Sequence, residues 1–271
     1  MRLVFLGTPP AAVPPLRALV SAGHDVALVV SRADAKRGRG STLQPSPVKA
    51  AAVELGLPVT DDVDDVLALD PPAALGVVVA YGRIIKPHVL AALPMVNLHF
   101  SLLPRWRGAA PVERAILAGD TRTGVDLMDV EEGLDTGGIH REVVLDIGPD
   151  ETADELRARL VAAGTDLLIE GLAAGIGTPR PQEGEATYAE KLRPEELQVD
   201  WARPPKAIHD LVRVGGAWTT HAGKRLKVWR STLSADGQLE LLEVQPEGKG
   251  RMAFRDWANG ARWKPGDPLG T

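Results

Sequence analysis

Cysteine is absent from the 271 residues, and aromatic residues make up only 4% of them. Without cysteine the chain has no disulfide, no thiolate nucleophile, no iron–sulfur ligand and no cysteine-type zinc site. No apolar run approaches the roughly 18 residues that span a membrane. The apolar start meets Gly7 too soon for a secretory signal. We therefore expect a cytoplasmic protein without membrane association.

The composition that is present resembles that of a folded protein, with 44% hydrophobic and 25% charged residues. The chain is longer than the roughly 100 to 200 residues of one typical domain, which favours two. The net charge of -5 hides an asymmetry. Residues 204–271 carry 11 Lys and Arg against 7 Asp and Glu, a net +4, and the remainder is -9. The basic end is compatible with a polyanionic partner, although ordinary surface variation gives the same pattern.

Short apolar runs alternate with helical segments over the first two thirds of the chain. The pattern predicts strands at 2–6, 25–30, 73–80, 95–100, 123–130 and 139–147, and helices at 11–22, 47–55, 86–93, 110–118 and 153–173. Thr152 and Glu155 form a capping-box signature at the start of the last helix. This alternation predicts an α/β fold with a Rossmann-like open, mostly parallel sheet, in which ligands bind beyond the carboxyl ends of the strands.

Proline and glycine interrupt the pattern near residue 178 and again near residue 204. We therefore predict a catalytic domain over 1–178, a linker over 179–203 and a small C-terminal domain over 204–271. Short segments separated by turns indicate that this last domain is β-rich and of OB-like barrel type. Four of the six Trp lie in it, and in so small a domain we expect them in the core.

Glycine-rich phosphate-binding motifs are missing. Gly7 follows the first strand, but the second and third glycines of GxGxxG do not occur, so Gly7 is interpreted as part of a structural turn. No GxxxxGK[ST] motif exists either. Dinucleotide binding through these motifs is therefore not expected.

The segment 97–111 carries the strongest chemical signal. Asn97 and His99 share a face of a strand near its end, because side chains alternate along a strand. An imidazole exchanges protons near neutral pH, and a carboxamide N–H can donate to an oxygen that gains negative charge. Asp135 follows a later strand, in a glycine-flanked loop from which a carboxylate could orient His99. Taken singly, each residue also fits a structural role: Asn97 and Asp135 in turns, and His99 as an interior histidine.

Together these motifs resemble the folate-dependent formyltransferases, and within them the family that formylates methionyl-tRNA. The resemblance rests on Asn-x-His followed by Ser-Leu-Leu-Pro-Arg-Trp-Arg-Gly-Ala-Ala-Pro, and on Gly-Leu-Asp-Thr-Gly at 133–137. It extends over 4–9, 38–40, 45–49, 80–84 and 244–249, so that it covers essentially the whole chain. Asn-x-His alone is a weak signal, whereas the long run after it is specific.

The resemblance implies roles for particular residues. The catalytic residues would be Asn97, His99 and Asp135. The folate would lie against Tyr81, Gly82, Arg83, Ile84, Ser101, Leu102, Leu103, Pro104, Val130, Glu131, Glu132 and Gly133. The tRNA would contact Arg37, Arg39, Lys49, Lys224, Arg225 and Lys227. No metal is expected, because the histidines lack zinc-motif spacing.

The implied activity is transfer of a formyl group from 10-formyltetrahydrofolate to the amino group of methionine on initiator Met-tRNA, for translation initiation, by a monomer. Three alternatives stay open: a formyltransferase for a small amine such as a nucleotide-linked amino sugar, a non-catalytic paralogue that binds folate or tRNA, and a hydrolase of the formyl-folate.

Several positions depart from the resembled pattern. Ser41 and Thr42 stand where a basic residue is common, Phe100 stands where a small residue or proline is usual, and the C-terminal region is short. Asp126 replaces a small or β-branched residue. None of these departures removes Asn97, His99 or Asp135, so formyl transfer is the firmer expectation and the identity of the acceptor the softer one.

Overall fold

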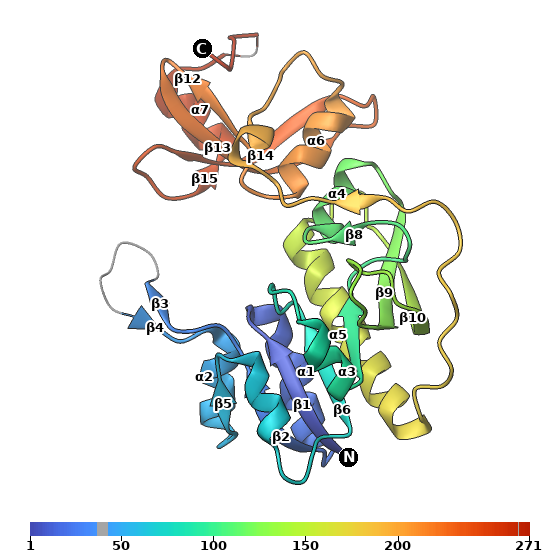
Figure 1. The fold of residues 1–271 in the computed structure, drawn as a ribbon. Helices are drawn as coiled ribbons and strands as arrows, with labels where there is room; N and C mark the ends of the chain where they lie inside the picture. Colours follow the sequence, from blue (N-terminus) through green and yellow to red (C-terminus); the bar gives the residue numbers. More distant parts are fainter. Residues whose placement is uncertain (37–42, 265) are drawn as a thin grey trace. The chain divides into compact units, whose positions relative to one another are not determined.

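A computed structural model describes residues 1–36, 43–264 and 266–271 (Figure 1). These residues form two compact units. The first takes in 1–109, 124–145 and 157–188, and the second takes in 110–123, 146–156 and 189–271. Each unit is thus assembled from several stretches of chain, whereas the sequence predicts three consecutive parts. The domain boundaries at 178 and 203 stay a prediction.

A seven-stranded sheet forms the centre of the first unit. Its order is β10 (Ile139–Asp146), β9 (Arg122–Asp129), β7 (Met95–His99), β6 (Leu75–Val79), β1 (Arg2–Gly7), β2 (Asp25–Val30) and β5 (Val59–Thr60). The strands from β5 to β7 are parallel, and β9 runs antiparallel to β7. Every residue of β6 is buried, as expected of a parallel strand covered on both faces. The predicted α/β fold with a mostly parallel sheet is confirmed.

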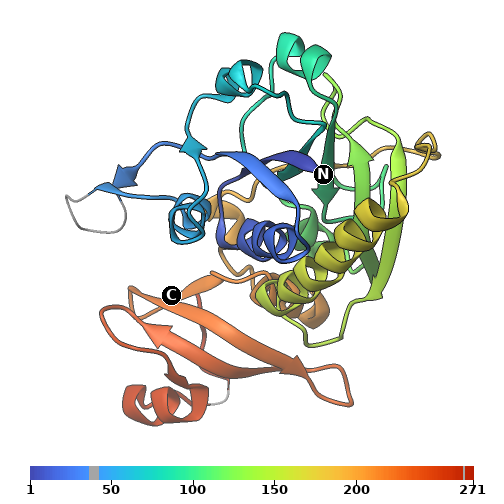
Figure 2. The same ribbon diagram turned by 90° about the horizontal axis from the view of Figure 1, so that it is seen from below.

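Helices cover both faces of this sheet (Figure 2). One side carries α1 (Val13–Ser21), α2 (Pro47–Glu54) and α5 (Ala153–Ala174), and the other carries the 3-10 helix η2 (Val63–Ala68) and α3 (Pro87–Ala92). Val4 and Leu6 of β1 pack in one buried cluster with Val66 of η2 and Val89 of α3. The layers therefore follow from the apolar residues that alternate between the two faces of β1.

The long helix α5 begins as the sequence predicts. Thr152 N–H and its hydroxyl donate to the Glu155 carboxylate at 2.9 and 2.8 Å, and Glu155 N–H donates back to the Thr152 hydroxyl. These bonds, first of all the one from the Thr152 backbone, hold the pKa of Glu155 at about 2. The capping box is therefore confirmed. Farther along, Gly164 lies so close to Val125 of β9 that a Cβ there would be 3.0 Å from the Val125 side chain.

Short elements connect the larger ones. They are η1 (Pro10–Ala12), β3 (Ala35–Lys36), β4 (Leu43–Gln44), β8 (Arg107–Gly108), α4 (Pro111–Leu117), β11 (Tyr188–Ala189) and η3 (Pro194–Leu197). The pair β3 and β4 is antiparallel and flanks residues 37–42, which lie outside the described residues.

The second unit contains a four-stranded antiparallel sheet. Its order is β12 (Trp218–His221), β13 (Lys224–Leu233), β14 (Leu239–Pro246) and β15 (Met252–Ala253), with α6 (Pro205–Arg213) and α7 (Phe254–Ala261) packed on it. Its core holds Trp257, and Trp263 packs against that core. Trp218 and Trp229 do not belong to this cluster, so the expectation that all four Trp lie in the core is wrong for these two.

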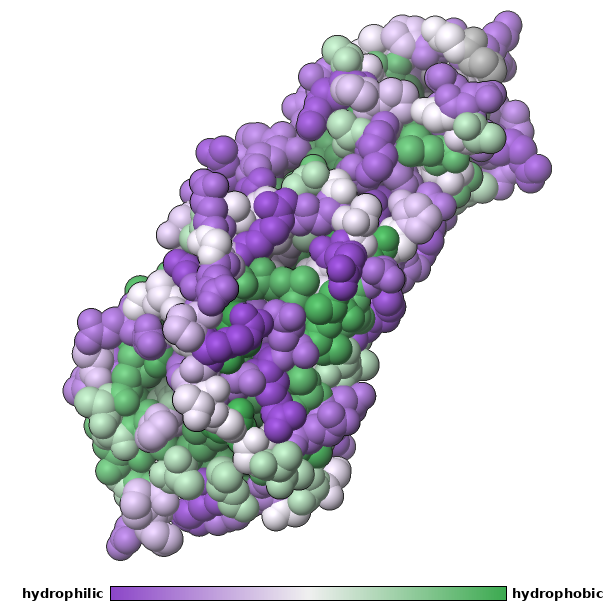
Figure 3. Space-filling model, turned by 90° about the vertical axis from the view of Figure 1, so that its right-hand side faces the viewer, coloured by the Kyte–Doolittle hydropathy of each residue, from purple (hydrophilic) through white to green (hydrophobic). Residues whose placement is uncertain are grey.

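The surface is mixed in character. None of the helices in the described part of the chain is long and apolar enough to cross a membrane. On the face drawn in Figure 3, hydrophilic residues run between patches of hydrophobic ones.

Gly124 is a test of how tightly β9 is packed. A methyl group there would lie 2.2 Å from the Val143 carbonyl oxygen and 2.4 Å from Leu102 Cδ2. We expect Gly124→Ala to lower the free energy of unfolding by about 1 to 3 kcal/mol, measured by urea denaturation. Gly250→Ala is the control, because a Cβ at Gly250 meets nothing within 4 Å. Equal stability of the two variants would contradict this packing.

Candidate functional site

Asn97 and His99 lie at the carboxyl end of β7. They are two residues apart in the strand and so face the same side of the sheet. His99 pairs across the strands with Asp126, and Asn97 pairs with Met128. Asn97 is half-buried, whereas His99 is 5% exposed. The structure therefore places the predicted pair on one face, as the strand alternation requires.

The His99 ring is held from two sides. Its Nε2 lies 2.9 Å from the Trp106 carbonyl oxygen, and its Nδ1 lies 3.6 Å from Asp135 Oδ2. Because a carbonyl only accepts, Nε2 carries the hydrogen in the first contact. Nδ1 is then the nitrogen that faces the carboxylate. The structure thus brings His99 and Asp135 together, with the ring orientation fixed by both neighbours.

Asp135 lies in the loop between β9 and β10, with a φ of 50°. Asp is one of the few residues that tolerate this left-handed conformation. Its Oδ2 also accepts a hydrogen bond from Gly108 N–H at 2.8 Å. At the base of the loop, Asp129 N–H donates to Gly138 O, and a Cβ on Gly137 would lie 2.1 Å from Asp129 O. A glycine at position 137 is therefore required by a close approach of backbone.

Gln182 is a supporting residue that sequence reasoning missed. Its amide nitrogen donates to Asp135 O at 2.8 Å and to Gly137 O at 2.9 Å. Arg107 in turn donates to the Gln182 side-chain oxygen at 2.6 and 3.1 Å. Gln182 was overlooked because it lies in the proline-rich stretch that was interpreted as a linker. The sequence offers one weak signal for Gln182. Arg107 lies inside the Ser-Leu-Leu-Pro-Arg-Trp-Arg motif, and no acidic or amide side chain near it in the sequence is an obvious partner for its charge.

The loop at 130–138 has a second support that the sequence did not reveal. His140 Nε2 lies 2.7 Å from Asp129 Oδ1, and its Nδ1 lies 3.1 Å from Gly177 O. The two residues stand on either side of the loop, one at the end of β9 and one at the start of β10. The pair therefore holds the loop base at the side-chain level as well.

The segments predicted to hold folate follow three strand ends. Tyr81 is buried in the apolar cluster of β1 and α3, and Val130 packs against the same cluster. Thr8, after β1, donates to the Tyr81 carbonyl oxygen at 3.1 Å. The Ile84 side chain is 91% exposed, and Arg83 reaches the Asp61 carbonyl oxygen at 3.1 Å. The segments that carry Tyr81 and Val130 therefore lie together, because both side chains pack in the same apolar cluster.

The third segment, Ser101–Pro104, forms a turn directly after β7. The Ser101 hydroxyl donates to the Arg105 carbonyl oxygen at 2.6 Å, and Leu103 is buried with Met128 and Ile139. Leu103 N–H donates to Asp126 Oδ2 at 2.7 Å. The turn is therefore fastened to β9, beside the face that carries His99.

Asp126 is fully buried in β9. Burial raises the pKa of its carboxyl to about 7, and the hydrogen bond from Leu103 N–H opposes this rise. Its Oδ1 has no hydrogen-bond partner within the described residues. Burying a carboxyl group costs free energy, so Asp126 is an unusual residue for the interior of a sheet.

The residues predicted to contact tRNA fall in different places. Arg37 and Arg39 lie outside the described residues, and Lys49 of α2 pairs with Asp34 at 2.7 Å. Lys224, Arg225 and Lys227 lie on β13 of the second unit.

Aromatic side chains accompany the basic residues of β13, which the sequence did not predict. The Arg225 guanidinium lies 3.9 Å from the Trp218 ring centre, and Lys227 Nζ lies 5.5 Å from that of Trp229. Arg251 lies 3.5 Å from the same Trp229 ring. Arg225, Lys227 and Trp229 are two residues apart and share one side of β13. We name the residues Trp218, Arg225, Lys227, Trp229 and Arg251 the basic-aromatic surface.

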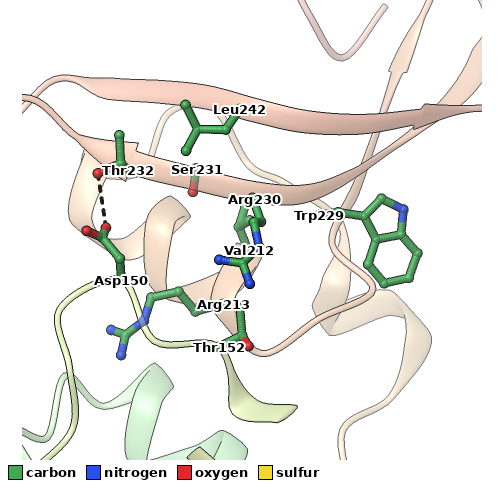
Figure 4. Close-up of a pocket in the computed structure, with 9 residues that line it drawn as sticks. All are labelled: Asp150, Thr152, Val212, Arg213, Trp229, Arg230, Ser231, Thr232 and Leu242. Carbon is green, nitrogen blue, oxygen red and sulfur yellow. Dashed lines mark hydrogen bonds between the residues drawn. The ribbon is translucent and has the colours of Figure 1, made fainter. Parts of the chain in front are cut away.

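A separate cavity of about 180 Å³ lies in the second unit, lined in part by Asp150, Arg213 and Ser231 (Figure 4). The Arg213 guanidinium is fully engaged: it donates to Gly148 O and Glu151 O and pairs with Asp210 at 2.9 Å. The cavity therefore offers no unpaired Arg213 charge to a ligand. No cluster of three or more metal-ligating side chains occurs in the described ranges.

Comparison with known proteins gives the family of this chain. Residues 1–172 match the family described as formyl transferase, and residues 191–236 match its C-terminal domain. The methionyl-tRNA formyltransferase of Solibacter usitatus is 42% identical, and the match covers 100% of this chain and 99% of that protein.

Two solved structures share the fold. The methionyl-tRNA formyltransferase from Clostridium thermocellum superimposes with a TM-score of 0.67 at 19% identity, covering 92% of this chain and all of that one. The N-formyltransferase from Helicobacter canadensis, solved with folinic acid and dTDP-3-aminofucose, gives 0.66 at 19% identity, covering 86% and 87%.

The chain belongs to the formyl transferase family. It is an enzyme of one-carbon transfer, and within the family it groups with the methionyl-tRNA formyltransferases.

The buried Asp126 carboxyl makes stability depend on pH. Because its folded-state pKa lies above the unfolded value, the unfolded state releases this proton first as the pH rises. Between about pH 4 and 7 the wild type should therefore lose stability, on the order of a few kcal/mol, that Asp126→Asn does not lose. Urea denaturation of both proteins at pH 4.5 and 7.5 measures this, since other titrations cancel in the difference. A stability difference that is the same at both values would contradict the ionisation assigned to Asp126.

Proposed function

We propose that this chain transfers a formyl group from 10-formyltetrahydrofolate to the α-amino group of methionine on initiator Met-tRNA. The observation that carries the proposal is the joint placement of Asn97, His99 and Asp135 in a chain whose full-length relatives are methionyl-tRNA formyltransferases. The Helicobacter canadensis enzyme, which shares the fold, was solved with folinic acid, a formyl-folate. That supports a folate as the formyl donor.

In the proposed reaction the methionine amine adds to the formyl carbon, and the formyl oxygen gains negative charge. Asn97 donates its carboxamide N–H to this oxygen, and His99 donates an imidazole N–H. His99 Nε2–H now donates to Trp106 O, so it would exchange this partner for the formyl oxygen. Asp135 keeps the ring oriented. The amine proton passes through water to N10 as the bond from carbon to N10 breaks, so N10 keeps the electron pair and gains this proton.

The folate would lie along Ser101–Pro104, with its pterin between Tyr81–Ile84 and Val130–Gly133. Tyr81 and Val130 pack in the same apolar cluster, which supports this role because it holds the two segments on either side of the pterin at a fixed distance from each other. The exposed side chain of Ile84 offers an apolar surface to a ring. Glu131 is held by the Thr136 hydroxyl at 3.4 Å, within the loop that also carries Asp135.

The basic-aromatic surface would contact the tRNA. Arginine and lysine neutralise phosphates without reading sequence, and aromatic rings stack on bases or on guanidinium groups. Lys224 would extend this surface, and Arg37, Arg39 and Lys49 would contact the acceptor end. In this proposal residues 204–271 form the tRNA-binding domain, joined by 179–203 to a catalytic domain at 1–178, and the protein acts as a cytoplasmic monomer.

A small amino-sugar acceptor is the second candidate, because the Helicobacter canadensis structure was solved with dTDP-3-aminofucose. The basic-aromatic surface favours tRNA over this candidate, since a small acceptor does not need it. Formyl transfer from labelled 10-formyltetrahydrofolate to initiator Met-tRNA, elongator Met-tRNA, an amino-sugar nucleotide and no acceptor separates the possibilities. Label on the initiator alone supports the proposal. Label on the sugar, or formate release without an acceptor, overturns it.

Removal of the Asn97 carboxamide tests the catalytic assignment. We expect Asn97→Ala to lower kcat by roughly 100- to 1,000-fold, because an oxyanion donor is worth about that much. Steady-state kinetics with initiator Met-tRNA measure the effect. Asn259→Ala, at an exposed position of α7, is the matched control and should keep the wild-type rate. An Asn97→Ala rate within threefold of the wild type would overturn the role.

Loss of positive charge on β13 tests the tRNA surface. We expect the double variant Arg225→Ala, Lys227→Ala to raise KM for Met-tRNA, leave KM for the folate unchanged and make tRNA binding less salt-dependent. The slope of log K against log salt should fall by about one for each phosphate contact that is lost. Arg255→Ala is the control, because Arg255 is an exposed cation on α7 away from this strand. An unchanged slope in the double variant would refute the assignment.

A further inference from the structure

Asp126 lies beside the catalytic pair without belonging to it. It pairs with His99 across β7 and β9, and residues that are directly opposite in an antiparallel pair project to the same face. The Asp126 side chain is fully buried on that face. The carboxyl is therefore built into the floor of the site, next to the imidazole.

Among the described residues, this carboxyl has one hydrogen-bond partner, which lies in the turn that follows β7. Asp126 Oδ2 accepts from Leu103 N–H at 2.7 Å, and Leu102 of the same turn packs against Gly124, two residues earlier on β9. Gly124 and Asp126 share a face of the strand. The turn thus rests on β9 through apolar contacts of Leu102 and of Leu103, which is buried with Met128. Asp126 supplies the polar contact.

A carboxyl is an expensive group for holding a single backbone N–H in the interior. Oδ1 has no hydrogen-bond partner within the described part of the chain, so no hydrogen bond offsets the free-energy cost of burying this oxygen. We propose that Asp126 is a positioning residue, which fixes the Ser101–Pro104 turn through Leu103 N–H and thereby sets the affinity for the formyl donor. This inference rests on the proposed function, in which the folate lies along that turn.

The ionisation of Asp126 gives the proposal a signature. Burial raises its pKa to about 7, so the carboxylate predominates above that value and the neutral acid below it. An ionised acceptor makes the stronger hydrogen bond to N–H. The donor KM should therefore rise as the pH falls below about 7.

Other charged groups act on the same region. They are His99 on β7, Glu142 on β10, and Arg180, which pairs with Glu142 at 2.9 Å. Because several charged groups surround Asp126, the wild-type profile alone does not identify the group, and a variant at position 126 is needed.

The experiment compares the full-length wild type, Asp126→Asn, Asp126→Ala and Thr123→Val from pH 5.5 to 9. Steady-state kinetics give kcat and KM for each substrate, and calorimetry gives the Kd for 5-formyltetrahydrofolate as an unreactive probe. Thr123→Val is the matched control, because Thr123 is also buried in β9, with an unpartnered hydroxyl, but projects to the opposite face.

Asp126→Ala should raise the donor KM and the probe Kd about tenfold above pH 7, while KM for Met-tRNA stays within twofold. Asp126→Asn keeps an oxygen that accepts from Leu103 N–H. It should bind the donor within threefold of the wild type and lose the pH dependence of the donor KM. If Asp126→Ala does not fold, this flat profile of Asp126→Asn decides the matter.

A wild-type pH profile that persists in Asp126→Asn would overturn the inference, as would an Asp126→Ala variant with unchanged donor affinity, or one whose KM for the two substrates rises equally. A wild type that transfers no formyl group at all but binds the probe normally contradicts the proposed function instead. The two failures are thereby distinguished.

Discussion

The antiparallel pairing of β9 with β7 is the constraint on which the site depends. It sets Asp126 opposite His99 and Met128 opposite Asn97, so that one face of two strands carries these four side chains, beneath the turn that follows β7. A shift of β9 by one residue would turn Asp126 and Met128 to the opposite face, away from His99 and Asn97. The parallel strands supply the framework, but the single antiparallel neighbour gives the site its partners.

Around this pairing the chain uses backbone hydrogen bonds more than charges to hold reactive groups. His99 is fixed by a carbonyl of Trp106, Asp135 by the N–H of Gly108, and the Asp135 loop by Gln182 bonding to two carbonyls. Such contacts fix the direction of a side chain without adding net charge beside it. In the proposed reaction His99 exchanges its bond to Trp106 O for the formyl oxygen, while the bond from Gly108 N–H to Asp135 can stay in place. The buried Asp126 is the exception, and its elevated pKa reflects the cost of a charge there.

The second unit shows a different use of side chains. On β13 the alternation of a strand places Arg225, Lys227 and Trp229 on one side, and Trp218 of β12 and Arg251 add to it. Guanidinium groups stacked on indole rings are held in place while their N–H groups stay available at the edge. The same rings would be ordinary core residues if β13 were covered on that side. Whether these rings lie at the surface or in a core depends on whether another element packs on that face of β13, and the sequence alone does not show this.

Local patterns determined most of the fold from the sequence. The apolar runs, the turns between them and the Thr152 capping box act over a few residues, so strands such as β2 and the helix α5 were predicted within a residue or two. The motif residues Asn97, His99 and Asp135 were recognisable for the same reason. Only the tertiary structure decided their supports. Gln182 reaches Arg107 and the Asp135 loop from a segment far along the chain, and Asp129 meets His140 only because β9 and β10 bring them together. Such contacts leave no periodic trace, and the burial that gives Asp126 its pKa likewise exists only after the strands have paired.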